Sequence, residues 1–578
     1  MDHMDTEATQ GLQLRGQFTR RQLVGAGLAI PAIGVVMAAC GDDKSDTKTT
    51  DAVVGGDTTV AGGDTTVAPD TTGGTAVAGG TIRVASTKPA SPLDPIAMVD
   101  LGTYNVIAQS FEYLTGPEGA GIGPMLATEW AANADSTEWT FTLREGVKWH
   151  DGSDFTSADV VATLGRIAAV GDGLGGSLPT EDDPDAPPPA ADAKPTQRLV
   201  AGAVTATDDL TVVVKLDSPN ASLPYLVSIF NPQSAITPAS FVAGSTLDAT
   251  PAGTGPWIMD TYDPNTGIKW KRNDAWWGGA IALEAIDMQF FSDLAAQVTA
   301  MSGGSVDAIQ QFSVVGGDAL INDANFNVVE VDAANHRQIW FGCDEGQFID
   351  KRVRQAFALG IDRDELVQTL FAGKASVAND HVIFDLYTFF DPDAVDQRVR
   401  DTDAAKALLA DAGFPDGIKA TLNAVDLQEI PQLAELLQLQ LADAGFDLTL
   451  NVESDSTFYG TQWCVTYPCA GSAELGIVDY GHRPTPDIYL LKAFRSGGDW
   501  NSSQYASPAL DAAILEYQSS GEEAARKVAC GKIESTMWED VPAAIAYRYN
   551  ALGGFSKSFT GVEFTALGHT LFQKAAQV

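Results

Sequence analysis

Residues 136–167 (STEWTFTLREGVKWHDGSDFTSADVVATLGRI) show the sharpest change of hydrophobic pattern along the chain. In the first part, polar residues separate the apolar ones, as in a strand with one buried face: Trp139, Phe141 and Leu143. A second strand is predicted from Val147 onwards, before a tight turn at Asp151-Gly152. Thr156 and Asp159 have the spacing of a capping box, which predicts a helix after them. The segment therefore predicts strand, turn and helix in close succession.

Helical and strand patterns also alternate in the second half of the chain. One helical face after residue 350 carries small and apolar residues at helical spacing: Val353, Ala356, Phe357 and Gly360. Asp350 is placed to cap this helix, and Asp362 with Glu365 can cap the next one. A leucine stripe at positions 433, 436, 437 and 441 is followed by a strand-like segment at 447–452. Helices and strands in this order indicate α/β layers.

Near its start the chain carries a short apolar run, 23–39, which follows two arginines and precedes a cysteine. The run is short for a membrane span, which needs roughly 20 apolar residues, and glycine and proline interrupt it. Basic residues before it and small residues after it predict an export signal, and Arg20-Arg21 fits the twin-arginine pattern. Met37-Ala38-Ala39-Cys40 resembles a bacterial lipobox, with Met37 where leucine is usual. We expect lipidation at Cys40; the alternative is a buried helix with a chance cysteine.

Two segments have compositions that cannot form a core. Residues 41–80 consist almost entirely of Gly, Thr, Asp, Ala and Val and contain GGDTTVA twice, so we expect a flexible tether. Residues 171–197 are rich in Pro, Asp, Ala and Gly and predict a mobile surface excursion, after which 204–216 return as a hairpin. The remaining body, about 81–578, is long enough for two or three lobes.

Charge and missing motifs argue against several classes of function. The formal net charge of −41 and the pI near 4.2 disfavour binding to nucleic acid. The six histidines form no HxxxH or HExxH pair, and no GxSxG, Walker A or GxGxxG motif follows a suitable strand. We therefore expect no metal site, no cofactor and no catalytic residue. A secreted hydrolase stays as a distant alternative, because carboxylates are too abundant to be paired from sequence alone.

Four cysteines remain once Cys40 is set aside. Outside the cytoplasm, an even number of cysteines suggests disulfides. Cys464 and Cys469 flank the short loop CVTYPC and are a candidate pair, and Cys343 with Cys530 is the leftover pair. Zinc is the alternative, but the spacing is not CxxC and no histidine cluster accompanies it.

Several motifs resemble those of extracellular solute-binding protein family 5, the peptide- and nickel-binding receptors of ABC importers. The family segment TFxLRxGVKFHDGxxxTAxDV reads TFTLREGVKWHDGSDFTSADV here. Further matches follow in the family's order: LDPIAMVDLGTYNVIAQSFEYL (93–114), GTGPWIMDTYDPNTGIKWKRNDAWWGG (253–279), FIDKRVRQAFALGIDRDELVQTLFAGKA (348–375), AAKALLADAGFPDG (404–417) and QLQLADAGFDLTL (438–450). The resemblance covers about 81–578.

The resemblance implies an α/β, two-lobed periplasmic-binding-protein type II fold (cluster C) with an extra subdomain in the first lobe. The expected order is export signal 1–40, tether 41–80, first lobe 81–332 plus 534–578 with a subdomain at about 111–200, and second lobe 333–533. We expect the lobes to close as a hinged clamp around a small solute, with strands crossing near 325–340 and 530–540. The chain would be a lipid-anchored, exported monomer at the cell surface or in the periplasm, and an ABC permease would be its partner.

Residues 476–490 (GIVDYGHRPTPDIYL) form the predicted ligand site, because charged, proline and aromatic residues gather there without a regular period. By the resemblance, Asp479 would meet the α-ammonium group of a peptide; the alternative is an ion pair with Arg483. A peptide main chain could pair with strands at 99–102 and 476–479. The full set of predicted ligand contacts is Val99, Asp100, Leu101, Gly102, Trp257, Phe458, Trp463, Gly476, Ile477, Asp479, Tyr480 and His482.

Peptide is the expected cargo. An oligosaccharide, an opine-like compound or a chelated metal such as nickel is the alternative on the same fold. For each predicted aromatic contact, packing in a hydrophobic core is the competing interpretation. The sequence leaves the export route open between the twin-arginine and general pathways.

Overall fold

The computed structural model describes residues 77–95, 98, 100–118, 121–169, 180–182, 197–199, 202–242, 247, 253–466 and 469–578. The predicted export signal, Cys40 and nearly all of the predicted tether lie outside these residues. Val99 and most of the predicted excursion at 171–197 also lie outside them.

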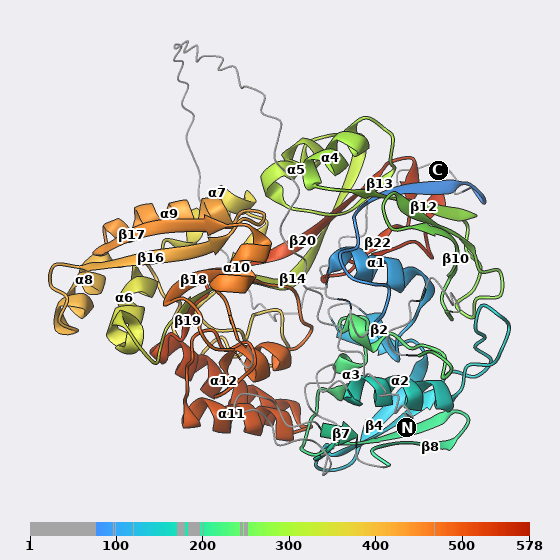
Figure 1. The fold of residues 1–578 in the computed structure, drawn as a ribbon, viewed down its shortest axis with the longest axis horizontal. Coiled ribbons are helices and arrows are strands. Elements are labelled where there is room, and N and C mark those ends of the chain that lie inside the picture. Colours follow the sequence, from blue (N-terminus) through green and yellow to red (C-terminus); the bar gives the residue numbers. More distant parts are fainter. Residues whose placement is uncertain are drawn as a thin grey trace, which may run out of the picture. The chain divides into compact units, whose positions relative to one another are not determined.

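A 12-stranded sheet runs through the described part of the chain and joins two hydrophobic cores (Figure 1). Its main order is β10 (Trp257–Asp263), β11 (Gly267–Arg272), β12 (Ala285–Phe291), β1 (Thr81–Thr87), β13 (Ala308–Phe312), β20 (Tyr547–Ser556), β14 (Phe326–Phe341), β18 (Leu475–Tyr480), β16 (Ile418–Val425) and β17 (Phe446–Glu453). The short strands β15 (Ala375–Val377) and β19 (Ala543–Ala544) pair with β20 and β14. Strand β20 therefore lies between β13 and β14, although it comes from the C-terminal part of the chain.

The first lobe, as we use the term, is the part built around a core of residues within 82–113, 229–288, 308 and 555–575. Strand β1 pairs in parallel with β12 and β13, while β10 to β12 form an antiparallel meander. The helices are α1 (Leu101–Ser110), α4 (Leu294–Ser302) and α5 (Val314–Ile321). Two small strand pairs complete the lobe, β21 (Phe559–Thr560) with β24 (Ala576–Gln577) and β22 (Glu563–Phe564) with β23 (Thr570–Leu571).

The first lobe also contains a separate core within residues 114–236, which we call its subdomain. Its antiparallel sheet has the order β4 (Ala127–Ala132), β5 (Glu138–Leu143), β9 (Thr211–Lys215) and β8 (Val204–Asp208). The subdomain also contains helix α2 (Ser157–Ala169), the short helix α3 (Leu223–Leu226) and the 3₁₀ turn η1 (Pro232–Ser234). Two further strand pairs are β2 (Thr115–Glu118) with β3 (Gly121–Pro124) and β6 (Thr180–Asp182) with β7 (Gln197–Leu199).

The hydrophobic pattern predicts several elements of the subdomain correctly. The strand with Trp139, the helix after Thr156 and the hairpin at 204–216 are confirmed. The Asp159 carboxylate accepts from the backbone N–H of Thr156 (2.9 Å), as a capping box requires. The second strand predicted from Val147 is wrong, because the described backbone there makes only a single antiparallel bridge, between Lys148 and Asp154.

The second lobe, as we use the term, is the part built around a core of residues within 334–549. Its helices are α6 (Lys351–Gly360), α7 (Arg363–Phe371), α8 (Thr402–Asp411), α9 (Ile430–Ala442), α10 (Asp455–Thr461), α11 (Pro508–Ser519) and α12 (Glu523–Asp540), with a 3₁₀ turn η2 (Gln347–Ile349) and a π-helix η3 (Tyr489–Phe494). The predicted caps are confirmed: Asp350 accepts from Arg352 N (2.9 Å) and Asp362 from Glu365 N (3.0 Å). The strand predicted at 447–452 is β17.

Strands β14 and β20 pass from one core to the other as an antiparallel pair. Their register shifts between Val331 and Asn335, so a bulge lies where β14 enters the second lobe. The predicted first crossing near 325–340 is thus β14. The predicted second crossing near 530–540 is wrong, because those residues lie in helix α12 and the return is made by β20.

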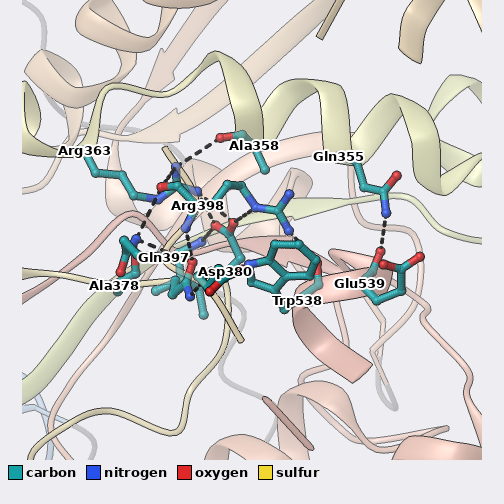
Figure 2. A network of polar contacts seen from close by, with 12 residues as sticks. Gln355, Ala358, Arg363, Ala378, Asp380, Gln397, Arg398, Trp538 and Glu539 are labelled. Carbon is teal, nitrogen blue, oxygen red and sulfur yellow. Dashed lines mark hydrogen bonds and ion pairs between the residues drawn. The ribbon is translucent and has the colours of Figure 1, made fainter. Parts of the chain in front are cut away.

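A buried network of arginine and aspartate joins distant parts of the second lobe, as Figure 2 shows. Asp380 accepts two bonds from Arg363 Nη2 (2.9 and 2.7 Å) and one from Arg398 Nε (2.8 Å). The backbone N–H of Ile545 donates to the same carboxylate (3.1 Å), and the Arg398 guanidinium lies over the ring of Trp538 (4.2 Å). One carboxylate therefore compensates two buried cations and ties α7 to the segment that precedes β20.

We expect Asp380→Asn to lower the free energy of unfolding by about 3–5 kcal/mol, because it leaves two buried guanidinium groups without a counter-charge. Chemical denaturation of the purified protein measures this change. Asp426→Asn removes the same charge from an exposed position and should stay within about 0.5 kcal/mol. Equal effects of the two substitutions would contradict a structural role for the network.

Strand β18 lies so close to β14 that one position has room only for glycine. Gly476 is the register partner of Trp340, and a Cβ atom at Gly476 would lie 2.2 Å from Cη2 of that indole. We expect Gly476→Ala to destabilise the protein by about 1–3 kcal/mol through overpacking. Gly460→Ala is the matched control, because a Cβ at Gly460, in α10, meets no atom within 4 Å. It should be neutral or stabilising by up to about 1 kcal/mol, and the sign difference can be read from melting temperatures.

Candidate ligand-binding site

A cavity of about 270 Å³ lies between segments that belong to the two lobes. One wall comes from residues 225–233 and the other from residues 483–500. The volume is close to the lower end of the roughly 300–1,000 Å³ that is usual for small-molecule sites. The lining consists of Tyr225, Leu226, Phe230, Asn231, Gln233, Arg483, Pro484, Thr485, Ile488, Lys492 and Trp500.

Local hydrogen bonds hold the 225–233 wall in an irregular conformation. The side chain of Asn231 donates to the carbonyl of Leu226 (2.7 Å), and the hydroxyl of Ser228 accepts from the N–H of Phe230 (3.2 Å). Gln233 donates to the carbonyl of Met98 (3.3 Å) and so fixes the segment to the first lobe. These bonds stabilise the chain between α3 and η1, where no regular element forms, and five side chains of the segment line the cavity.

The opposite wall follows β18 and contains the π-helix η3. The N–H of Arg495 donates to the carbonyl of Leu490 (2.8 Å), and the N–H of Trp500 donates to the carbonyl of Lys492 (2.8 Å). Single turns of π-helix are rare and frequently occur at functional sites. Here the turn brings Lys492 and Trp500 to one wall of the cavity.

The cavity lining carries two cations and no carboxylate. The ammonium group of Lys492 forms an ion pair with Asp499 (3.1 Å) and lies over the ring of Trp500 (5.8 Å). The guanidinium of Arg483 donates from Nη1 to the carbonyl of His482 (2.8 Å), and no carboxylate among the described residues forms an ion pair with it. The site is therefore locally positive in a strongly acidic protein.

Asp479 has a different environment from the one that the sequence predicts. Its partner across the β14–β18 ladder is Arg337, and the two side chains form an ion pair. Arg337 is only 1% exposed and also binds Glu429 through Nε (2.8 Å) and Nη2 (2.9 Å). Among the described residues Asp479 forms its ion pair with Arg337 and not with Arg483, although the charge of Arg483 also opposes the rise of its pKa.

Asp479 is not among the cavity residues, although 29% of its side chain is exposed. Burial raises the pKa of Asp479, and the nearby Arg337 opposes that shift. Its predicted contact with an ammonium group stays a prediction.

The neighbours of Asp479 on the chain support the cavity wall from behind. Tyr480 points to the other face of the strand, where its ring stacks on His336 (5.4 Å) and reaches Trp500 (6.2 Å). His482 is buried, and its Nδ1 accepts from the N–H of Ala334 in the β14 bulge (3.0 Å). Burial lowers the pKa of His482 to about 3, so the ring is neutral.

Phe230 meets the His482 ring edge-on at 5.3 Å. His482 therefore connects the crossing strand β14 to the cavity wall at 225–233. Neither Tyr480 nor His482 is itself a lining residue.

The other predicted contacts in the second lobe are mostly core residues. Ile477 and Phe458 are fully buried in its hydrophobic core, and Gly476 is buried against Trp340. Trp463 packs edge-on against Tyr459 (5.4 Å). None of these residues lines the cavity, so core packing is the interpretation that fits their surroundings.

The predicted contacts of the first lobe that the structure describes also lie in structural positions. Asp100 caps α1 by accepting from Thr103 N (2.9 Å), and Leu101 and Gly102 are the first residues of that helix. The predicted strand pairing at 99–102 is therefore wrong for these residues. Trp257 is fully buried in the first-lobe core and is not a pocket wall.

The cysteines separate into a pair and two single thiols. Cys464 and Cys469 are joined by a disulfide that closes the loop after α10, with their Cα atoms 4.2 Å apart. The predicted Cys343–Cys530 pair is wrong, because both thiols are free. Cys530 is buried within α12, whereas Cys343 follows β14 and its thiol donates to the carbonyl of Phe341 (3.4 Å).

The sequence pattern missed the 225–233 wall of the cavity, whereas the predicted ligand site at 476–490 overlaps the other wall in part. The segments PYLVSIFNPQ and RPTPDIYLLKAF have no clean period, and only the second was considered as a ligand site. The feature of these segments that could have indicated a binding site is the presence of aromatic, amide or charged residues beside proline.

Two negative findings concern the described residues only. They contain no group of three or more His, Cys, Asp or Glu side chains that could hold a metal ion. Within the same residues, none of the helices combines the length and the apolar composition that a membrane crossing needs.

Comparison with known proteins identifies the family. The profile of bacterial extracellular solute-binding proteins, family 5 Middle, matches residues 121–502. Heme-binding protein A of Haemophilus influenzae is 23% identical over 85% of this chain and 88% of its own length, and the dipeptide-binding protein of Escherichia coli is 24% identical over 56% and 62%.

The periplasmic binding protein DppA from Helicobacter pylori, solved with the peptide STSA, has the same fold, with a TM-score of 0.67, 18% identity and coverage of 87% and 98%. The chain therefore belongs to family 5 of the bacterial extracellular solute-binding proteins: it is the substrate-binding component of an ABC importer and not an enzyme.

Proposed function

We propose that this chain is a lipid-anchored receptor that captures short peptides between its two lobes and presents them to an ABC permease. The observation that supports it most is the cavity, because its lining is shared between segments of both lobes. A ligand that contacts both walls binds the closed arrangement better than an open one. Its binding energy then shifts the population towards the closed form, which a permease can recognise.

The positions of the crossing strands and the interlobe contacts support a clamp. Strands β14 and β20 join the lobes, and the bulge of β14 at 331–335 interrupts their ladder. Away from these strands in the sequence, Arg526 of α12 donates to the Ser222 hydroxyl (2.7 Å) and Ala221 N donates to the Gln518 carbonyl (3.1 Å). Breaking these few polar bonds while the strands stay paired would open the cavity.

Peptide is the cargo that we propose because two of the relatives are named for peptides and because a small, partly aromatic cavity suits a short one. A relative of similar likeness is named for heme, so the fold itself does not select the cargo. An oligosaccharide, an opine-like compound or a chelated metal such as nickel is the alternative that a binding screen separates.

The membrane attachment rests on the sequence before the described residues. Arg20-Arg21 and the apolar run 23–39 support export by the twin-arginine route, and Cys40 supports lipidation. A tether of about 40 residues would reach a few tens of ångströms if it behaves as a flexible coil. This reach lets the receptor meet its permease while it stays anchored.

Peptide capture is tested by titrating the purified 81–578 protein with a mixture of di- and tripeptides and by measuring the melting temperature and the radius of gyration. We expect ligand to raise the melting temperature by several degrees and to compact the protein. Arg526→Ala should weaken binding, because it removes an interlobe bond of the closed form, while Lys557→Ala, an exposed control, should not. Turnover of any peptide, or binding without compaction, would contradict the proposal.

Anchoring is tested in the bacterial host with full-length protein. Wild type should incorporate labelled fatty acid and sediment with membranes, while Cys40→Ala should lose the label and be released as soluble protein. Cys343→Ala, which alters another thiol, should keep the lipid. Labelling that persists in Cys40→Ala would refute the lipidation site without affecting the proposal on peptide capture.

A further inference from the structure

The charged residues of the cavity lining are positive, whereas the protein as a whole is negatively charged. The formal net charge is −41, yet both charged residues of the lining, Arg483 and Lys492, are cations. Because Asp499 pairs with Lys492, that lysine contributes little net charge. Arg483 therefore supplies the positive charge of the lining that no ion pair among the described residues neutralises, with the Asp479 carboxylate as a nearby opposing charge.

The position of Arg483 is fixed by bonds of its backbone and of its neighbours. The hydroxyl of Tyr387 donates to the Arg483 carbonyl (2.8 Å), and the preceding His482 is held by Asn335 through its backbone N–H (2.7 Å). Within the described part of the chain the guanidinium donates one hydrogen bond, to the His482 carbonyl, and an arginine has five N–H donors. The group is thus held at the cavity with donors in the planar arrangement that suits a carboxylate.

The cavity lining offers no negatively charged side chain that could pair with a cationic group of a ligand. The lining has no Asp or Glu, and its remaining polar side chains are neutral: Tyr225, Asn231, Gln233 and Thr485. Asp479 is the residue predicted to bind a ligand ammonium group. It forms an ion pair with Arg337, which also forms one with Glu429. The lining therefore offers cationic side chains to a ligand and no carboxylate.

On the basis of the proposed function, we infer that the receptor selects its cargo by a carboxylate group that binds Arg483, and that an α-ammonium group is not required. The apolar part of the cargo packs between Phe230 and Trp500, which come from opposite walls of the cavity. The class of cargo is then a small organic acid with an apolar or amide body, of which an N-blocked peptide is one example.

Two sets of peptides with identical side chains test this inference by calorimetry. N-acetylated tripeptides with a free carboxylate lack the ammonium group, and tripeptide amides with a free amine lack the carboxylate. We expect the acids to bind and the amides to bind at least 10-fold more weakly. Arg483→Gln should weaken binding of the acids about 10- to 150-fold, as for loss of a charge-assisted hydrogen bond. Arg483→Lys should restore part of the affinity.

A matched variant separates the role of Arg483 from general charge effects. Arg495→Gln removes the same charge from an exposed position outside the lining and should keep full affinity for the acids. Circular dichroism and melting temperature of Arg483→Gln show that the variant is folded.

Amides that bind as well as acids, or unchanged affinity in Arg483→Gln, would overturn the inference. If no peptide binds in either form, the peptide proposal fails. Native mass spectrometry of protein purified from its own host then identifies the retained cargo and shows whether it is an anion. A retained anion that is lost from Arg483→Gln and kept by Arg495→Gln would support the inference. A neutral or cationic cargo, or no anion bound in any of these experiments, would overturn it.

Discussion

The β14–β20 ladder is the constraint on which the arrangement of this protein depends. Both strands contribute residues to two hydrophobic cores, so each must be continuous across the transition between them. The bulge in β14 interrupts strand pairing at the transition between the cores. The N–H of Ala334, which lies in this bulge, donates instead to the ring of His482. A buried N–H needs a partner, and a side chain provides one that is less restrictive than a neighbouring strand.

The same histidine relates the crossing strands to the cavity. His482 precedes Arg483 and contacts Phe230, so a displacement of the bulge acts directly on both walls. Its ring stays neutral because burial lowers its pKa to about 3, and Nδ1 can therefore accept a hydrogen bond at any ordinary pH. An uncharged side chain therefore helps to couple the cavity wall to the crossing strands.

Local patterns predicted those elements whose determinants are close together in the sequence. The strand with Trp139, the helix after Thr156 and the caps Asp350 and Asp362 follow from alternation and from short capping contacts. Strand β20 (YRYNALGGFS) has no alternation of polar and apolar residues, because both faces of the sheet are covered there. The second crossing was therefore predicted too early in the sequence, at 530–540, where the chain forms a helix. The residues 225–233 have no regular period that would mark them as a binding segment, and only the tertiary fold brings them opposite Arg483.

Strand geometry constrains how Asp479 and Tyr480 can be used together. Adjacent residues in a strand point to opposite faces, so at most one of them faces any one side of β18. In the structure Tyr480 points towards Trp500, and Asp479 points towards Arg337 and Glu429. A motif match alone does not contain this information, whereas the period of the strand does. Charge recognition in the cavity is therefore better assigned to Arg483. This residue follows strand β18, so the alternation of side chains along the strand does not fix its direction.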